Sequence, residues 1–146
     1  MDEIRTWLYI GSYRDTKNQS YLALKSIQAM LQLAEKVEQP GITSLYLPVE
    51  DLAPIPVDLL GKGIAFIREQ KLQNHRILVA CGAGINRSTA FCVAALKEME
   101  GLGLLEAFRE VKRNHPESIP HQPVWESLCT YYNETIPYID VVLIRG

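Results

Sequence analysis

Long apolar runs and an excess of one charge are both missing from this sequence. No continuous apolar segment reaches the length of a membrane-spanning helix, about 20 residues. Fifteen Lys and Arg stand against 17 Asp and Glu, a formal net charge of -2, and the basic residues are scattered rather than gathered into a stripe. The electrostatic signature of nucleic-acid or anionic-membrane binding is therefore absent. The N-terminus lacks the apolar run of a signal peptide, so we expect a cytoplasmic protein without membrane or nucleic-acid partners.

Cysteine is scarce as well. The chain has three, Cys81, Cys92 and Cys129, with no CxxC pair and no Cys/His cluster at zinc-binding spacing. This odd number argues against a disulfide framework and against structural zinc. Cys92 and Cys129 are expected to be core residues. A chain of 146 residues with 47% hydrophobic composition can build one core without such supports. We therefore expect a single domain over residues 1–146.

Extended and helical patterns follow one another along the chain, which predicts an α/β fold with a central, mostly parallel sheet of four to five strands and helices on both faces. The run RILVAC is apolar between polar residues, as is typical of a central strand buried on both faces. The apolar tail, 136–146, is expected to cover the core or to make a dimer contact. We expect strands at 6–10, 27–33, 42–49 and 76–81, and helices at 21–25, 59–67, 88–100, 104–114 and 124–133.

A glycine-rich segment connects the RILVAC strand to the helix at 88–100, which ends at Gly101 and begins with a capping-type Ser88-Thr89 pair. A loop in this place collects unpaired N–H groups at the positive end of the helix dipole. Glycine lets these groups turn toward one centre, and an arginine adds a charged fork that matches two phosphate oxygens. The segment is thus a predicted phosphate site, which phosphate, sulfate or vanadate can occupy, formed by Gly82, Ala83, Gly84, Ile85, Asn86 and Arg87.

Cys81 precedes this loop directly. A lone cysteine at a strand end is usually an inert small hydrophobic residue. Here the helix dipole and Arg87 would raise the thiolate fraction, and a thiolate beneath a bound phosphate is placed to attack it. These residues therefore predict a cysteine nucleophile placed to attack a bound phosphate ester.

The sequence CGAGINRS has a cysteine, five residues, an arginine and a hydroxyl residue, and it resembles the signature loop of the protein tyrosine phosphatase superfamily. The longer stretch ILVACGAGINRSTAFCVAALKE is most similar to the dual-specificity branch. LYIGSYRD and LPVED resemble the opening strand and general-acid loop of that branch, and LLEAFREVKRNHP resembles one of its closing segments. The resemblance extends from about Trp7 to Tyr132, and it implies that branch's α/β fold.

The resemblance also implies a mechanism. Cys81 would form a phosphocysteine, Arg87 would bind the phosphoryl oxygens, and Asp51 would protonate the leaving oxygen and then activate water. Ser88 would place a hydroxyl near the sulfur and ease its departure, in addition to any role as a helix cap. Glu50 is a rival for the acid role, and Asp51 could instead be an ordinary turn residue.

No metal or cofactor is implied. The three histidines, His75, His115 and His121, have no companions at ligand spacing and are expected at surface or turn positions. Ile85 and Asn86 are expected to shape the pocket rim. Because the loop residues before Arg87 are uncharged, a phosphorylated protein or peptide is the expected substrate, with phosphotyrosine and phosphoserine or phosphothreonine as candidates.

One departure from the family pattern is Ala80, where a histidine usually precedes the nucleophile. It motivates the alternative of a catalytically weak or inactive phosphate-binding module. An RNA 5'-triphosphatase is a second alternative, disfavoured by the absent basic patch. A rhodanese-type sulfurtransferase is a third, disfavoured because its loops are usually shorter and lack the acid residue.

Overall fold

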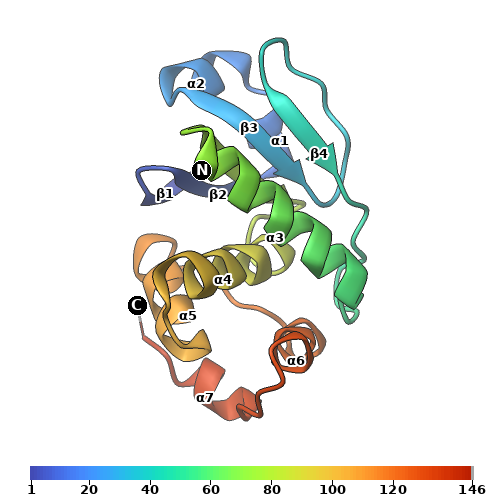
Figure 1. Ribbon diagram of the computed structural model, residues 1–146, viewed down its shortest axis with the longest axis vertical. Coiled ribbons are helices and arrows are strands. Elements are labelled where there is room, and N and C mark those ends of the chain that lie inside the picture. The colour runs from blue at the N-terminus through green and yellow to red at the C-terminus, as the bar shows by residue number, and fades with distance from the viewer. Residues whose placement is uncertain (146) are drawn as a thin grey trace.

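The computed structural model describes residues 1–145, in which five strands form one sheet in the order β1-β2-β5-β3-β4 (Figure 1). Four strands run parallel, and only β1 is antiparallel to its neighbour. The predicted α/β fold with a mostly parallel sheet is confirmed. The strands are β1 Asp2–Arg5, β2 Leu8–Ser12, β3 Ile27–Gln32, β4 Thr43–Tyr46 and β5 Arg76–Cys81.

Helices cover both faces of the sheet. One face carries α3 and α4, with α5 and α6 packed on α4, whereas α1 and α2 lie on the other face (Figure 1). Within residues 1–145, no helix has both the length and the apolar composition needed to cross a membrane. The helices are α1 Tyr13–Thr16, α2 Gln19–Leu24, α3 Val57–Leu72, α4 Arg87–Glu100, α5 Leu104–Asn114, α6 Gln122–Tyr131 and α7 Tyr138–Val142.

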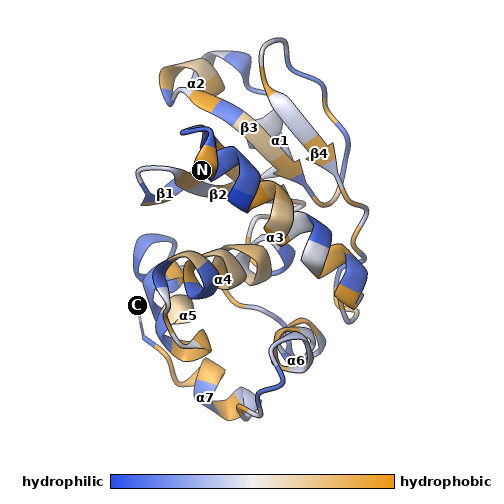
Figure 2. Ribbon diagram, viewed as in Figure 1, coloured by the Kyte–Doolittle hydropathy of each residue, from blue (hydrophilic) through white to orange (hydrophobic). Residues whose placement is uncertain are grey.

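Strand β5 occupies the centre of the sheet, as predicted. Because its side chains alternate, Ile77, Val79 and Cys81 face the larger core beneath α3 and α4, while Leu78 and Ala80 face the smaller cluster beneath α2. Helix α4 is buried along nine consecutive residues, 88–96, and Figure 2 shows its largely apolar composition. The fold thus fixes the end of β5 and the start of α4 from all sides.

Two edge strands differ from the prediction. Strand β1 was not predicted because it has one buried apolar residue, Ile4, among charged ones, which is typical of an edge strand and gives no apolar run. Strand β4 ends at Tyr46, earlier than predicted. The N–H groups of Leu47 and Val49 nevertheless donate to carbonyls at the end of β3 (2.9 and 3.1 Å). The extended segment therefore carries the two acids that follow it to the carboxyl edge of the sheet.

The ends of the helices also correct the prediction. Helix α4 begins at Arg87 with Asn86 as its N-cap residue, so Ser88 and Thr89 lie inside the first turn and do not cap it. Its end at Gly101, with φ of 71°, is as predicted. The predicted tail packs on the core through Val141 and Ile144 in its described part, whereas Gly146 lies outside the described residues.

Candidate active site

The backbone of the loop between β5 and α4 turns its carbonyl groups outward. Three of them accept hydrogen bonds from outside the loop: Gly82 from Tyr13 N (3.3 Å), Gly84 from His115 Nε2 (2.7 Å) and Ile85 from Ile119 N (2.9 Å). In a trans peptide the N–H points opposite to the C=O, so the amides of residues 83, 85 and 86 are aimed the other way. Among residues 1–145 no acceptor is found for any N–H of 82–86. These free donors lie at the start of a 14-residue helix, which is an anion-binding arrangement.

Gly84 is the one residue of the loop that no other amino acid could replace without strain. Its φ is +78°, which L residues rarely adopt. A Cβ at this position would also lie 2.6 Å from the carbonyl oxygen of Gly11 in β2. The loop therefore turns against the neighbouring strand, and this close approach sets its curvature.

Cys81 lies at the foot of the loop with 2% of its surface exposed. Its Sγ is 3.1 Å from Ser88 Oγ and accepts a hydrogen bond from Ser88 N at 3.4 Å. Ser88 and the N-terminus of α4 thus lie next to the sulfur, where they can stabilise negative charge on it. The other two cysteines are buried in the core as predicted, and burial raises the pKa of the Cys92 and Cys129 thiols. Cys81 is thus the candidate nucleophile among the three.

The guanidinium of Arg87 lies beside the loop and the segment that precedes α3. Its Nη1 donates to Val49 O at 2.8 Å, and Nη2 lies near Gly82. Its Nε is buried and has no hydrogen-bond partner among the described residues; the nearest carboxylate oxygen, of Asp51, is 3.6 Å away. A buried N–H without an acceptor is costly, and an oxygen of a bound phosphate would supply one.

The structure separates the two candidate acids. Asp51 Oδ1 accepts a hydrogen bond from Asn86 Nδ2 at 2.6 Å, and it also accepts one from Leu52 N at 3.1 Å, so the turn contact and the loop contact coexist. Glu50 is exposed and makes no side-chain hydrogen bond or ion pair within residues 1–145. Asp51 is therefore the acid that the fold brings to the loop.

The sequence did not predict the burial of two side chains of the site. Asn86 is buried rather than at a pocket rim, and its Oδ1 accepts from His121 N at 2.7 Å, which ties the loop to the start of α6. His115 lies at the turn after α5, one of the two kinds of position expected, but it is only 5% exposed, and its ring bonds Asp2 and Gly84. No local signal marks His115, because Asp2 lies 113 positions away. His75 and His121 are half-buried, and His75 Nδ1 bonds Gln70 Oε1 at 2.7 Å.

The amino-acid sequence of the chain matches the model of a known protein family. The sequence model described as "Dual specificity phosphatase, catalytic domain" matches residues 8–134. "Dual specificity protein phosphatase 5" of Homo sapiens is 30% identical over 139 residues, which cover 92% of this chain and 36% of that protein. "Dual specificity protein phosphatase 15" of Mus musculus is 30% identical over 125 residues, which cover 83% and 53%. The chain thus spans between about a third and a half of the length of these relatives.

Solved structures agree with the sequence match. Human DUSP28 superposes with a TM-score of 0.84 at 26% identity, over 91% of this chain and 96% of that one. A mouse putative dual specificity phosphatase, complexed with zinc tungstate, superposes with a TM-score of 0.84 at 26% identity, over 90% and 86%. Because the family match extends over most of the chain and the fold agrees with it, the chain belongs to the dual-specificity phosphatase family of the protein tyrosine phosphatase superfamily.

Proposed function

We propose that this chain is a protein phosphatase that hydrolyses phosphotyrosine, and phosphoserine or phosphothreonine, through a phosphocysteine intermediate. The observation that carries the proposal is the position of Cys81 Sγ beneath a loop whose amides, together with Arg87 Nε, have no acceptor within residues 1–145. Those donors suit the oxygens of a phosphoryl group, and the sulfur beneath them suits in-line attack. Membership of the family supports the same chemistry.

In the first step the Cys81 thiolate attacks phosphorus, so that an S–P bond forms while the P–O bond to the substrate side chain breaks. The leaving oxygen takes a proton from Asp51. Asp51 Oδ1 lies 3.6 Å from Arg87 Nε, which places the carboxyl group next to the bound phosphate. The loop amides and Arg87 stabilise the equatorial oxygens as charge develops on them.

In the second step water attacks phosphorus and the S–P bond breaks. Asp51 takes a proton from the water, and Cys81 leaves as a thiolate. Ser88 supports this departure, because its hydroxyl and its N–H both lie within hydrogen-bonding distance of Sγ. Inorganic phosphate and the regenerated enzyme are the products.

The loop's side chains suit a single phosphate on a protein. Gly82, Ala83, Ile85 and Asn86 are uncharged, so no lysine is available to neutralise additional phosphates. The mouse relative was solved with zinc tungstate, which contains an oxyanion. By analogy we propose that phosphate, sulfate, vanadate or tungstate occupies the loop of this chain.

Hydrolysis of a small aryl phosphate without added metal tests the proposal. We expect turnover by the wild type and competitive inhibition by tungstate. Ala80 stands where the family usually has histidine, so a chain that binds tungstate but hydrolyses neither aryl phosphates nor phosphopeptides would be a binding module, and the enzyme proposal would fail.

Replacing Asp51 with asparagine is expected to lower kcat by about 10²- to 10⁴-fold, the usual contribution of a general acid. The loss should be smaller for an aryl phosphate whose leaving phenol is acidic, because such a group departs without a proton. The alkaline decline of the kcat profile should also disappear. Steady-state kinetics across pH, with one aryl phosphate whose leaving phenol is acidic and one whose leaving phenol is not, measure the fall in kcat, its dependence on the leaving group and the pH profile.

The matched control is Glu50→Gln, the neighbouring acid, which makes no polar contact in the described chain. It should retain kcat within about twofold, since its side chain is exposed and bonds no residue of the loop within residues 1–145. If Glu50→Gln lowers kcat while Asp51→Asn does not, Glu50 is the general acid and the assignment of that role to Asp51 is wrong.

A further inference from the structure

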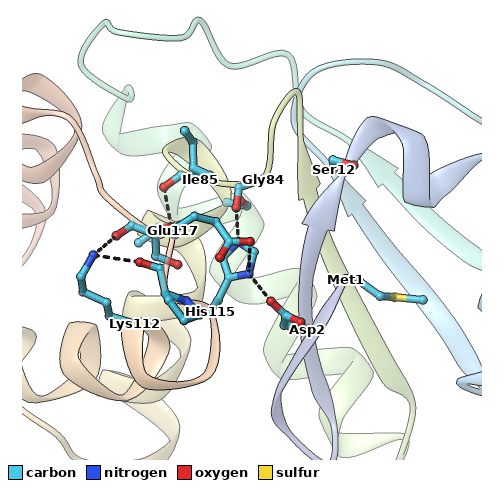
Figure 3. Close-up of polar contacts among 12 residues, drawn as sticks. Met1, Asp2, Ser12, Gly84, Ile85, Lys112, His115 and Glu117 are labelled. Atoms are coloured by element: carbon cyan, nitrogen blue, oxygen red, sulfur yellow. Dashed lines mark hydrogen bonds and ion pairs between the residues drawn. The ribbon is translucent and has the colours of Figure 1, made fainter. Parts of the chain in front are cut away.

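His115 connects three segments that are distant in the sequence. It follows α5 directly and is 5% exposed. Its Nδ1 lies 2.6 Å from Asp2 Oδ2 in β1, and its Nε2 lies 2.7 Å from Gly84 O in the phosphate loop. Figure 3 shows the imidazole ring between these two groups, with the Glu117 carboxylate beside it. The mechanism proposed above does not use this buried titratable side chain.

The partners of the ring determine where its protons lie. A backbone carbonyl only accepts hydrogen bonds, so Nε2 must donate to Gly84 O. Nδ1 faces two carboxylates, Asp2 at 2.6 Å and Glu117 at 3.2 Å, so it must carry a proton as well. Both contacts are satisfied at once only by the imidazolium. A zinc ion does not fit between Nδ1 and Oδ2, because two ligands of one tetrahedral zinc stand about 3.3 Å apart.

The Gly84–Ile85 peptide depends on this ring more than the neighbouring peptides depend on any side chain. The carbonyl of Gly82 is held by the backbone amide of Tyr13, and that of Ile85 by the backbone amide of Ile119 together with the Thr89 hydroxyl (2.8 Å). Gly84 O has no backbone donor within residues 1–145 and accepts from a side chain, that of His115. Because the peptide is planar, holding this carbonyl outward aims the N–H of Ile85 into the loop.

We infer that His115, held by Asp2, is a positioning residue that fixes the Gly84–Ile85 peptide so that the Ile85 amide binds a phosphoryl oxygen. The inference rests on the proposed function and extends it. His115 touches neither substrate nor sulfur; it acts through the loop backbone. A neutral ring carries one proton, and the two carboxylates favour its place on Nδ1. The lone pair of Nε2 then faces Gly84 O, and this repulsion releases the peptide.

Other groups near the ring also carry charge. The Met1 amino group pairs with Asp15 at 3.3 Å, and Lys112 Nζ donates to the carbonyls of Pro116 and Ser118 on the turn that holds Glu117. On the loop side lie Cys81 and Arg87, and Asp51 pairs with Asn86. Of these, the thiol and the terminal amine are, like the histidine, groups that can gain or lose a proton. The experiment must therefore separate His115 from both.

The test measures the affinity of inorganic tungstate by titration calorimetry from about pH 6 to 8, where a histidine changes charge. All variants carry Cys81→Ser, so that no thiol titrates. With His115 present, affinity should fall as pH rises. His115→Gln keeps an amide donor for Gly84 O that does not titrate, so its affinity should be independent of pH and should exceed that of the parent at the upper end. His115→Ala should bind roughly 10-fold more weakly than the parent at about pH 6.

A purely electrostatic role would give a different result. The Gln variant would then match the parent's weak, high-pH affinity at every pH, and the positioning inference would be wrong. Asp2→Asn removes one carboxylate at a half-exposed side chain, so the decline should begin at lower pH; an unchanged profile would contradict the inference. The matched control is His75→Gln, whose histidine bonds Gln70 and should keep the parent's profile.

Turnover of the Cys81 enzyme distinguishes failure of the positioning role of His115 from failure of the proposed phosphatase function. If the wild type hydrolyses aryl phosphate while His115 variants bind tungstate as the parent does, the inference fails and the phosphatase proposal stands. If the wild type neither binds tungstate nor hydrolyses, both fail. Thermal melting of each variant shows whether it is folded, and Asp2→Asn, at the surface, keeps the inference testable should His115→Ala unfold.

Discussion

Cys81→Ser is expected to abolish hydrolysis, with kcat lowered by roughly 10⁵-fold or more, the scale seen when a catalytic nucleophile is removed. A serine hydroxyl at this buried position is not deprotonated near neutral pH, so the contacts from Ser88 that favour a thiolate have no anion to stabilise. The loop amides and Arg87 are unchanged, so tungstate should still bind. Burst kinetics with an aryl phosphate and calorimetry with tungstate measure the two properties separately.

Cys129 provides the matched control for the Cys81→Ser variant. Cys129 is buried in α6, away from the loop, and burial raises the pKa of its thiol. Cys129→Ser should therefore keep kcat within about twofold, with only a modest loss of stability. Hydrolysis by the Cys81→Ser enzyme at the wild-type rate would overturn the phosphocysteine mechanism.

Gly84→Ala is expected to lower kcat/KM by about 10²-fold or more, since a displacement of about 1 Å in a catalytic group costs that much. The methyl group would lie 2.6 Å from Gly11 O and 3.2 Å from Ser12 N, both backbone atoms that cannot rotate away. Either the loop or β2 must shift, and the strain of the positive φ adds about 1–2 kcal/mol to the loss of stability. Urea unfolding and steady-state kinetics measure the two effects.

A substitution at Gly41 distinguishes the effect of backbone strain from the effect of the steric clash that a Cβ at Gly84 would make with β2. It has the same φ of +78° as Gly84, but no atom lies within 4 Å of the position a Cβ would take. Gly41→Ala should therefore lose about 1–2 kcal/mol of stability from the left-handed conformation alone and keep its full kcat/KM. If the two variants lose equal stability and both retain activity, the close contact with β2 does not set the loop's geometry.

The parts of the fold that were predicted correctly are those whose signals are contiguous. The buried strand, glycine loop and helix from 76 to 100 follow one another without interruption, so residue type and spacing were enough to place Cys81 and Arg87. The central position of β5 followed from its unbroken apolar run. The edge strand β1 has no such run, because only one of its four residues is buried.

The parts that were not predicted depend on partners far along the chain. Asn86 meets Asp51 across 35 positions, and His115 meets Asp2 across 113. Two adjacent acids, Glu50 and Asp51, cannot be distinguished by composition; only the turn after the extended segment decides which of them reaches the loop. Ser88 was wrongly given a capping role because the helix begins one residue earlier than its polar residues suggest.

The outward-facing carbonyls of the loop have a consequence for how selectivity can change. Because every donor offered to a phosphoryl group, apart from Arg87, is a main-chain amide, recognition of the anion does not depend on the side chains at positions 83 and 85. Ala83 is exposed and Ile85 half-buried, and neither supplies a side-chain donor. Substitutions at these two positions can therefore alter the surface that a phosphopeptide meets while the chemistry beneath it stays intact, which makes them the natural starting points for redesigning specificity.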